Sequence, residues 1–110
     1  MTGFAPAVRR LIIDRDQGLC ARCMYSGAEV HHRRPRGIGG SKDPATNAPA
    51  NGVLLCPSCH RWIESNRDRA RQDGWLVRQG QNPADIPVRY RGEWVLLRED
   101  GSIDRYEGTE

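Results

Sequence analysis

The sequence predicts a small α+β fold that is stabilised by a bound metal ion, and three observations support this. Only 37% of the 110 residues are hydrophobic and 6% aromatic, so burial alone can build only a modest core. The four cysteines form two Cys-x-x-Cys pairs, the spacing at which two thiolates reach one zinc ion. Helix-like and strand-like segments are mixed along the chain. We expect one domain spanning residues 1–110.

The first elements flank the first cysteine pair. Apolar residues at helical spacing predict an amphipathic helix over residues 6–16, followed by a stop at Gly18. A short strand is expected at residues 29–32, and Pro35 and Gly37 are expected to end it.

The next elements surround the second cysteine pair. Residues 37–52 are rich in glycine, proline and asparagine, which predicts an irregular loop of the length that is usually functional. A compact apolar strand at residues 53–55 and a polar helix over residues 60–73, ended by Gly74, follow it.

The C-terminal part is predicted to be a β-hairpin. Its strands are expected at residues 87–90 and 93–97, with Arg91 and Gly92 between them, and Asp100–Gly101 marks a further turn. Three tryptophans are interpreted as packing residues, namely Trp62, Trp75 and Trp94.

The cysteine pairs predict a structural zinc site. Cys20, Cys23, Cys56 and Cys59 would supply four thiolates at about 2.3 Å, which closes a tetrahedral site and leaves no open position for catalysis. A disulfide or thiol redox protein is the alternative. It requires an oxidising compartment or a thioredoxin-like pattern, and the sequence indicates neither.

The distribution of charge indicates a polyanionic partner. The net charge is +3, but residues 99–110 carry five acids and one arginine, so residues 1–98 carry +7. The basic segment that contains Arg33, Arg34 and Arg36 has no acid, which makes these arginines candidates for DNA phosphate contacts; a solvated loop is the alternative.

The chain has no apolar run near the roughly 18 residues of a membrane span and no signal-like start, so we expect a cytoplasmic protein without a membrane partner.

All three histidines border the cysteine pairs, in the segments VHHRRPRGIGG and NGVLLCPSCHRWIESN. These segments resemble the His-Asn-His (HNH) endonuclease family, whose ββα-metal core would cover about residues 17–75, with a hairpin extension at about residues 85–110. More loosely, the chain is similar to the small zinc-containing members carried by actinobacterial phages.

The resemblance implies a role for each residue of the motif. His31 and His60 would bind a catalytic metal ion, His32 would be the general base, and Asn51 would be structural within the catalytic motif. Adjacent strand residues point to opposite faces, so His31 and His32 can serve different partners. Histidine suits a base because its ordinary pKa near 6.5 leaves a neutral fraction at physiological pH.

The resemblance also implies an activity and partners. The reaction would be metal-dependent hydrolysis of DNA that leaves 5′-phosphate and 3′-hydroxyl ends. The catalytic ion would be Mg²⁺ or Mn²⁺, or, with imidazole ligands, Ni²⁺, Co²⁺ or Zn²⁺. Phage relatives often sit beside packaging genes, which implies terminase subunits as partners.

Other interpretations stay open for individual residues. Each histidine could be a surface residue, and His31 or His32 a zinc ligand instead. Asn47 competes with Asn51 for the motif position. Glu64 lies one helical turn after His60 and is either a further metal ligand or a surface glutamate. For the whole chain, the main alternative is a non-catalytic zinc-knuckle module that binds DNA.

Overall fold

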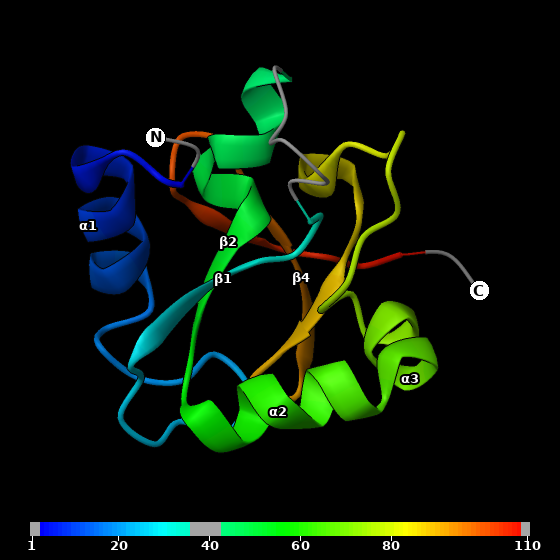
Figure 1. Cartoon of the computed structure of the whole chain (residues 1–110). Coiled ribbons are helices and arrows are strands. Elements are labelled where there is room, and N and C mark those ends of the chain that lie inside the picture. The colour runs from blue at the N-terminus through cyan, green and yellow to red at the C-terminus, as the bar shows by residue number, and fades with distance from the viewer. Residues whose placement is uncertain (1–2, 36–42, 109–110) are drawn as a thin grey trace.

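The computed structural model describes residues 3–35 and 43–108 (Figure 1). It confirms a mixed α and β fold. The elements, in chain order, are α1 (Pro6–Arg15), β1 (Glu29–His32), the 3-10 helices η1 (Pro44–Asn47) and η2 (Pro49–Asn51), β2 (Gly52–Leu55), α2 (Pro57–Ser65), α3 (Arg67–Gln72), the 3-10 helix η3 (Pro83–Asp85), β3 (Val88–Tyr90), β4 (Glu93–Leu97) and β5 (Ile103–Arg105).

The antiparallel β1–β2 hairpin places two adjacent histidines on opposite sides. His31 pairs with Val53 and His32 with Gly52. On the His32 side, Gly52 leaves room for Ile12 of α1, since a Cβ atom at that position would collide with the Ile12 side chain. On the other side, the ring of His31 meets a ring of α2. The expected strands are therefore confirmed, and they separate the two histidines as predicted.

Helix α2 begins directly at the second cysteine pair. Cys56 is its N-cap residue, and its sulfur accepts a hydrogen bond from the Cys59 N–H at 3.4 Å. Pro57 occupies the first helical position, where a missing N–H costs nothing. The cysteine turn and the helix start are thus one structure, which fixes His60 in the first turn.

The prediction of one helix over residues 60–73 is wrong. The chain forms α2 and α3, separated at Asn66, whose φ and ψ of −131° and 55° are not helical. The Asn66 side chain donates to the Trp62 carbonyl at 2.8 Å, so it satisfies a helix end instead of continuing the helix. Gly74 stops α3 as predicted, with a φ of +85°.

The predicted irregular loop contains regular structure. Residues 44–51 form η1 and η2, each of which begins with a proline that presets φ. The part of the predicted loop at residues 37–42 lies outside the described residues.

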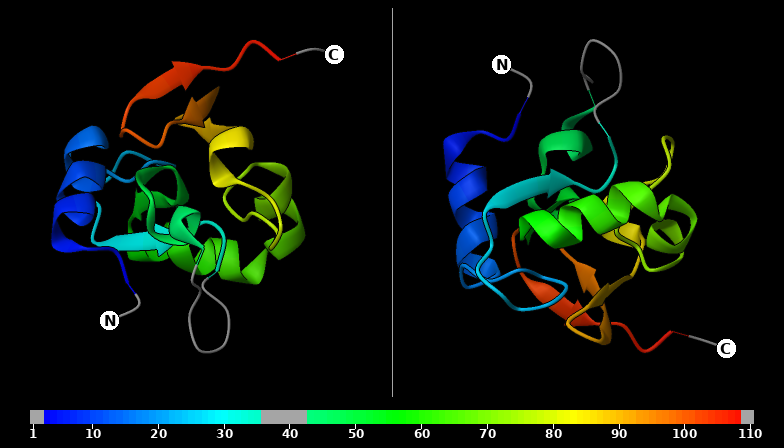
Figure 2. Two further views of the ribbon diagram at one scale, coloured as in Figure 1. Left: turned by 90° about the horizontal axis from the view of Figure 1, so that it is seen from above. Right: turned by 60° about the horizontal axis from the view of Figure 1, so that its bottom comes forward.

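The C-terminal hairpin is confirmed and extended. Arg91 and Gly92 have φ values of 51° and 85°, as a two-residue turn between antiparallel strands requires. Strand β5, which follows the predicted turn at Asp100–Gly101, pairs with β4 and makes a three-stranded sheet. Both views in Figure 2 show α1 and α3 at opposite sides of the molecule.

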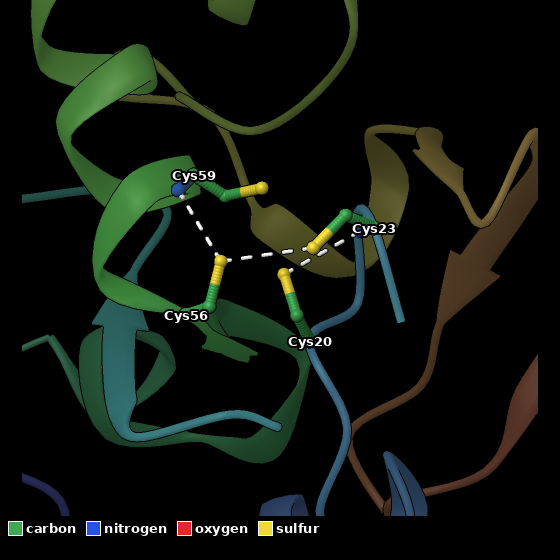
Figure 3. A group of neighbouring side chains, drawn as sticks. All are labelled: Cys20, Cys23, Cys56 and Cys59. Carbon is green, nitrogen blue, oxygen red and sulfur yellow. Dashed lines mark hydrogen bonds between the residues drawn. The ribbon is translucent and has the colours of Figure 1, made fainter. Parts of the chain in front are cut away.

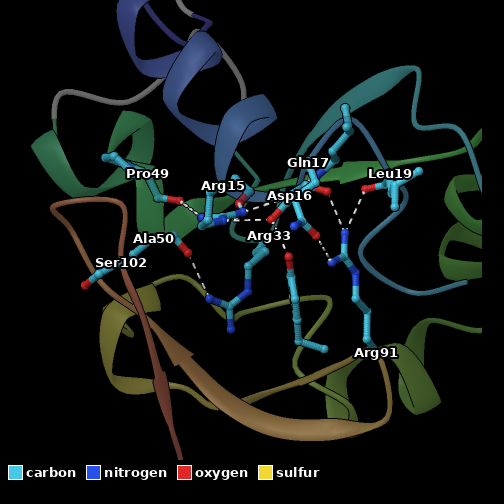
Figure 4. A network of polar contacts seen from close by, with 12 residues as sticks. Arg15, Asp16, Gln17, Leu19, Arg33, Pro49, Ala50, Arg91 and Ser102 are labelled. Atoms are coloured by element: carbon cyan, nitrogen blue, oxygen red, sulfur yellow. Dashed lines mark hydrogen bonds and ion pairs between the residues drawn. The ribbon is translucent and has the colours of Figure 1, made fainter. Parts of the chain in front are cut away.

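A buried carboxylate links this sheet to the rest of the fold. Asp16 is fully buried; its oxygens accept hydrogen bonds from Arg15, from the Tyr90 hydroxyl at 2.8 Å and from the Leu54 N–H at 2.9 Å. Arg91 donates to the Asp16 carbonyl at 2.6 Å (Figure 4). Burial and the neighbouring Asp16 charge raise the pKa of Tyr90, which therefore stays a neutral donor. The network joins α1, β2 and the C-terminal sheet.

The apolar core lies between these elements and includes Val53, Leu55, Ile63, Trp75 and Leu97. Within the described residues, no helix is long and apolar enough to cross a membrane.

Candidate active site and metal centre

The two cysteine pairs meet in one cluster (Figure 3). All four sulfur atoms, from Cys20, Cys23, Cys56 and Cys59, lie within 4.8 Å of one another, and those of Cys23 and Cys56 are 3.6 Å apart. A tetrahedral ion with Zn–S bonds of about 2.3 Å holds sulfur pairs about 3.8 Å apart. The cluster therefore fits a four-thiolate metal site.

The surroundings of the cluster favour a thiolate at Cys20, whereas burial raises the pKa of Cys23 and raises that of Cys59 to about 12. Burial raises the pKa of Cys20, but hydrogen bonds from backbone N–H groups of Cys23, Cys56 and Arg22 lower it to about 7 overall. The Arg22 guanidinium also donates to the Cys59 sulfur at 3.3 Å and stacks 3.9 Å from the Trp62 ring centroid. A positive charge at this position offsets the negative charge of a four-thiolate site.

The rings of His31 and His60, which are not part of the cysteine cluster, contact each other. The two rings meet edge to face with centroids 5.0 Å apart. His31 is 5% exposed, and its Nε2 lies 2.9 Å from the Trp75 carbonyl, which requires a hydrogen on Nε2. Burial is the main cause that lowers the pKa of His31 to about 4. His31 is therefore neutral near pH 7, with its lone pair on Nδ1, as a metal ligand requires.

Glu29 is a residue that the sequence reasoning missed. Its Oε1 lies 2.5 Å from Nδ1 of His60. A metal ion would therefore bind His60 through its other ring nitrogen, Nε2. Glu29 and His31 are two positions apart on β1 and so share a face. That alternation is the signal that could have identified Glu29.

Glu64 shares a surface hollow of about 320 Å³ with Glu29, His60 and Arg61. Its carboxylate is 55% exposed and pairs with Arg67 at 2.9 Å. The structure thus brings Glu64 near His60, as the helical spacing predicts, but its present partner is an arginine.

His32 occupies a different environment from His31. Its ring stacks on Phe4, with centroids 4.0 Å apart and planes 11° from parallel. Its Nε2 lies 2.8 Å from Oδ1 of Asn47, so the hydrogen is on Nε2 and the lone pair of neutral His32 is on Nδ1. Nothing in the sequence indicated that Phe4 or Asn47 would contact this histidine.

Asn51 is fully buried and makes three hydrogen bonds that hold neighbouring backbone. Its Oδ1 accepts from the Arg34 N–H at 2.7 Å, and its Nδ2 donates to the carbonyls of Arg34 at 3.0 Å and Thr46 at 2.8 Å. These bonds fasten the residues after β1 to η1. The two asparagines that competed at the sequence level thus have separate partners: Asn51 contacts backbone, and Asn47 contacts His32.

The predicted phosphate contact of Arg33 is wrong. The side chain is fully buried, and its guanidinium donates to four carbonyls, those of Gly74, Ala50, Pro83 and Ile86, at 2.8 to 3.1 Å. Burial lowers its pKa to about 9. Arg33 therefore joins distant segments of the interior and cannot reach DNA.

Arg34 requires the same correction, and Arg36 lies outside the described residues. The Arg34 side chain is 5% exposed and donates to the Gln81 carbonyl, to Asp43 and to Thr46 at 2.8 to 2.9 Å. Its charge is paired with the carboxylate of Asp43. Of the three tryptophans predicted to pack, Trp75 is 1% exposed. Trp62 is half-buried beneath the Arg22 guanidinium, and Trp94 is half-buried near that of Arg89.

Comparison with known proteins matches residues 20–65 to one family model, described as HNH endonuclease. The match begins at the first cysteine of the cluster and ends at the last residue of α2. Searches of curated proteins and of solved structures found no match.

Proposed function

We propose that this chain, whose residues 20–65 match the HNH endonuclease family model, is a metal-dependent DNA endonuclease in which His31 and His60 bind the catalytic ion. The observation that supports this most strongly is the contact between the two rings. A buried, neutral imidazole from β1 and a half-buried one from α2 lie side by side, and neither belongs to the cysteine cluster.

The hydrogen bonds of these rings prepare them for an ion. The Trp75 carbonyl orients His31, and the Glu29 carboxylate orients His60. Metal-binding histidines commonly have such a carbonyl or carboxylate partner on the other ring nitrogen. Glu29 and Glu64 offer the nearest carboxylates of the hollow, and either could add an oxygen ligand.

A divalent ion bound there would stabilise negative charge on the phosphate and on the departing 3′ oxygen. Mg²⁺ and Mn²⁺ suit the carboxylates, whereas Ni²⁺, Co²⁺ and Zn²⁺ suit the imidazoles. A four-thiolate zinc site at the cysteine cluster would hold the α2 start, and so His60, in place.

His32 would act as the general base. Its hydrogen bond to Asn47 keeps the Nε2 proton in place and presents the Nδ1 lone pair, while stacking on Phe4 restricts the ring plane. A water molecule positioned at Nδ1 would lose a proton to this nitrogen as its oxygen attacks phosphorus. Cleavage would leave a 5′-phosphate and a 3′-hydroxyl.

Incubation of the zinc-loaded protein with supercoiled plasmid tests this function. We expect open-circular or linear product with Mg²⁺, Mn²⁺, Ni²⁺ or Co²⁺, no product in EDTA, and resealing of the ends by DNA ligase. Plasmid binding without cleavage by every ion would favour a non-catalytic DNA-binding module. The resemblance to phage proteins extends the proposal to DNA packaging, with terminase subunits as partners; co-purification of a terminase subunit would support that extension.

A further inference from the structure

Two arginines that directly follow the candidate catalytic histidines, Arg33 and Arg34, are buried in the interior, so the phosphates of a DNA strand need other partners. Within the described residues, one groove is lined by three arginines and no acid. It has a volume of about 400 Å³ and is formed by Pro35, Arg67, Arg71, Val77, Arg78 and Gln79. We propose that this arginine groove binds phosphates of the DNA strand that is being cut, which rests on the nuclease function proposed above.

The groove lies next to β1, which carries His31 and His32, because residues 75–79 run alongside residues 31–35. Three hydrogen bonds with the same sequence offset fix this placement. His31 bonds the Trp75 carbonyl at 2.9 Å, the Val77 N–H donates to the Arg33 carbonyl at 2.8 Å, and the Gln79 side chain donates to the Pro35 carbonyl at 2.6 Å.

The two sites are therefore within reach of one nucleic-acid strand. Pro35 lines the groove and follows His32 by three residues, at most about 10 Å along an extended chain. A phosphate bound to an ion at His31 and His60 would have its neighbouring phosphates along the same strand, and the groove lies beside the segment that carries His31. The segment 75–79 thus couples the orientation of His31 to the placement of the groove.

The three guanidinium groups can turn to a phosphate at little cost. Arg67 and Arg71 pair with Glu64 and Asp68 at 2.9 and 3.4 Å, but both pairs are at the surface, where an ion pair contributes little. Arg78 is exposed and makes no ion pair among the described residues. Guanidinium groups bind phosphate oxygens in a bidentate manner, so the groove suits a polyphosphate chain.

The salt dependence of DNA binding tests the proposal. Binding of a fluorescein-labelled 20-base-pair duplex would be measured by anisotropy with Mn²⁺ at several salt concentrations, in a His32→Ala background that prevents cleavage. Each lost phosphate contact lowers the slope of log K against log salt by about 0.9. The combined Arg67→Gln, Arg71→Gln and Arg78→Gln changes should lower the slope by about 2 to 3 and weaken binding at least about tenfold. Arg78→Gln alone should lower the slope by about 1.

A matched control removes the same charge from the C-terminal sheet region through Arg89→Gln, Arg98→Gln and Arg105→Gln, three exposed arginines. The proposal is overturned if the control lowers the slope as much as the groove variant, or if a groove variant with normal zinc content and circular dichroism binds like its parent. If the folded groove variant binds like its parent while the wild-type protein cleaves plasmid, the nuclease function stands and only the groove proposal is wrong. If the wild type neither binds nor cleaves DNA, both proposals fail.

Discussion

His31 and His60 meet edge to face, with ring centroids 5.0 Å apart, although 28 residues of sequence separate them. The β1–β2 pairing and the start of α2 at Cys56 bring them together. The cysteine cluster therefore has a consequence beyond stability, because it holds the turn from which His60 projects.

The first prediction concerns the cysteine cluster. The purified protein should hold one zinc ion per chain, and Cys56→Ser should lose both the ion and cooperative unfolding, because zinc binding on the order of 10 kcal/mol exceeds the stability of a small domain. Elemental analysis and thermal melting measure this. A zinc-free protein with a reversible disulfide would instead support a thiol redox protein.

A second prediction tests the interior role of Arg33. Arg33→Met should lower the free energy of unfolding by about 3–5 kcal/mol, because it leaves four carbonyls, three of them in buried hydrogen bonds, without their donor. Urea denaturation measures the loss, and Arg78→Gln, at an exposed site, is the control with the same change in charge. A stable Arg33→Met protein that binds DNA poorly would restore the phosphate-contact interpretation.

The third prediction follows from the low pKa of His31. An unfolded histidine binds a proton below its ordinary pKa of 6.5, whereas folded His31 does so only below about 4. Its contribution to stability is therefore complete above pH 6.5 and falls as the pH drops from 6.5 to 4.

Urea denaturation of the wild type and His31→Gln, both with one equivalent of zinc for the cysteine cluster, would show this effect. Between pH 7 and pH 5 the wild type should lose on the order of 2 kcal/mol of unfolding free energy relative to His31→Gln. Effects of pH on the cysteines are common to both proteins and cancel in this comparison. An identical difference at both pH values would mean that His31 is not held neutral by burial.

The two asparagines should respond differently to substitution. Asn51→Ala removes three buried hydrogen bonds and should destabilise the protein by about 2–4 kcal/mol. Asn47→Ala should leave stability within about 1 kcal/mol of the wild type but lower the cleavage rate about 10-fold or more at unchanged KM, because His32 loses its orienting partner. Denaturation curves and steady-state kinetics would reveal the opposite pattern if these roles are exchanged.

Short-range patterns predicted most of the fold. The end of strand β1 was predicted from Pro35 and Gly37, the β3–β4 turn from Arg91 and Gly92, and the cluster from the cysteine spacing. The break at Asn66 was missed because an asparagine is compatible with a helix interior until its side chain bonds a carbonyl one turn earlier. Strand β5 was missed because its short segment pairs only through contacts with β4.

The site was predicted in its histidines but not in its arginines. A run of arginines in a sequence does not show which side chains enter the interior, since the carbonyls that bind Arg33 come from residues 17 to 53 positions away. Glu29 was within reach of sequence reasoning because it alternates with His31 on one strand. The stacking of Phe4 on His32 depends on the path of the N-terminal segment, which no local pattern encodes.

The cleavage rate as a function of Mn²⁺ concentration, measured for wild type, His32→Ala and His60→Ala, tests the central claim most directly. If His32 is the base, His32→Ala should be slower by about 10²–10⁴-fold at every saturating concentration, with an unchanged Mn²⁺ dependence. If His60 is a ligand, His60→Ala should need more Mn²⁺ and regain activity as the concentration rises. A shifted Mn²⁺ dependence in His32→Ala together with an unshifted one in His60→Ala would contradict the assignment, and full activity in both variants would contradict the active site itself.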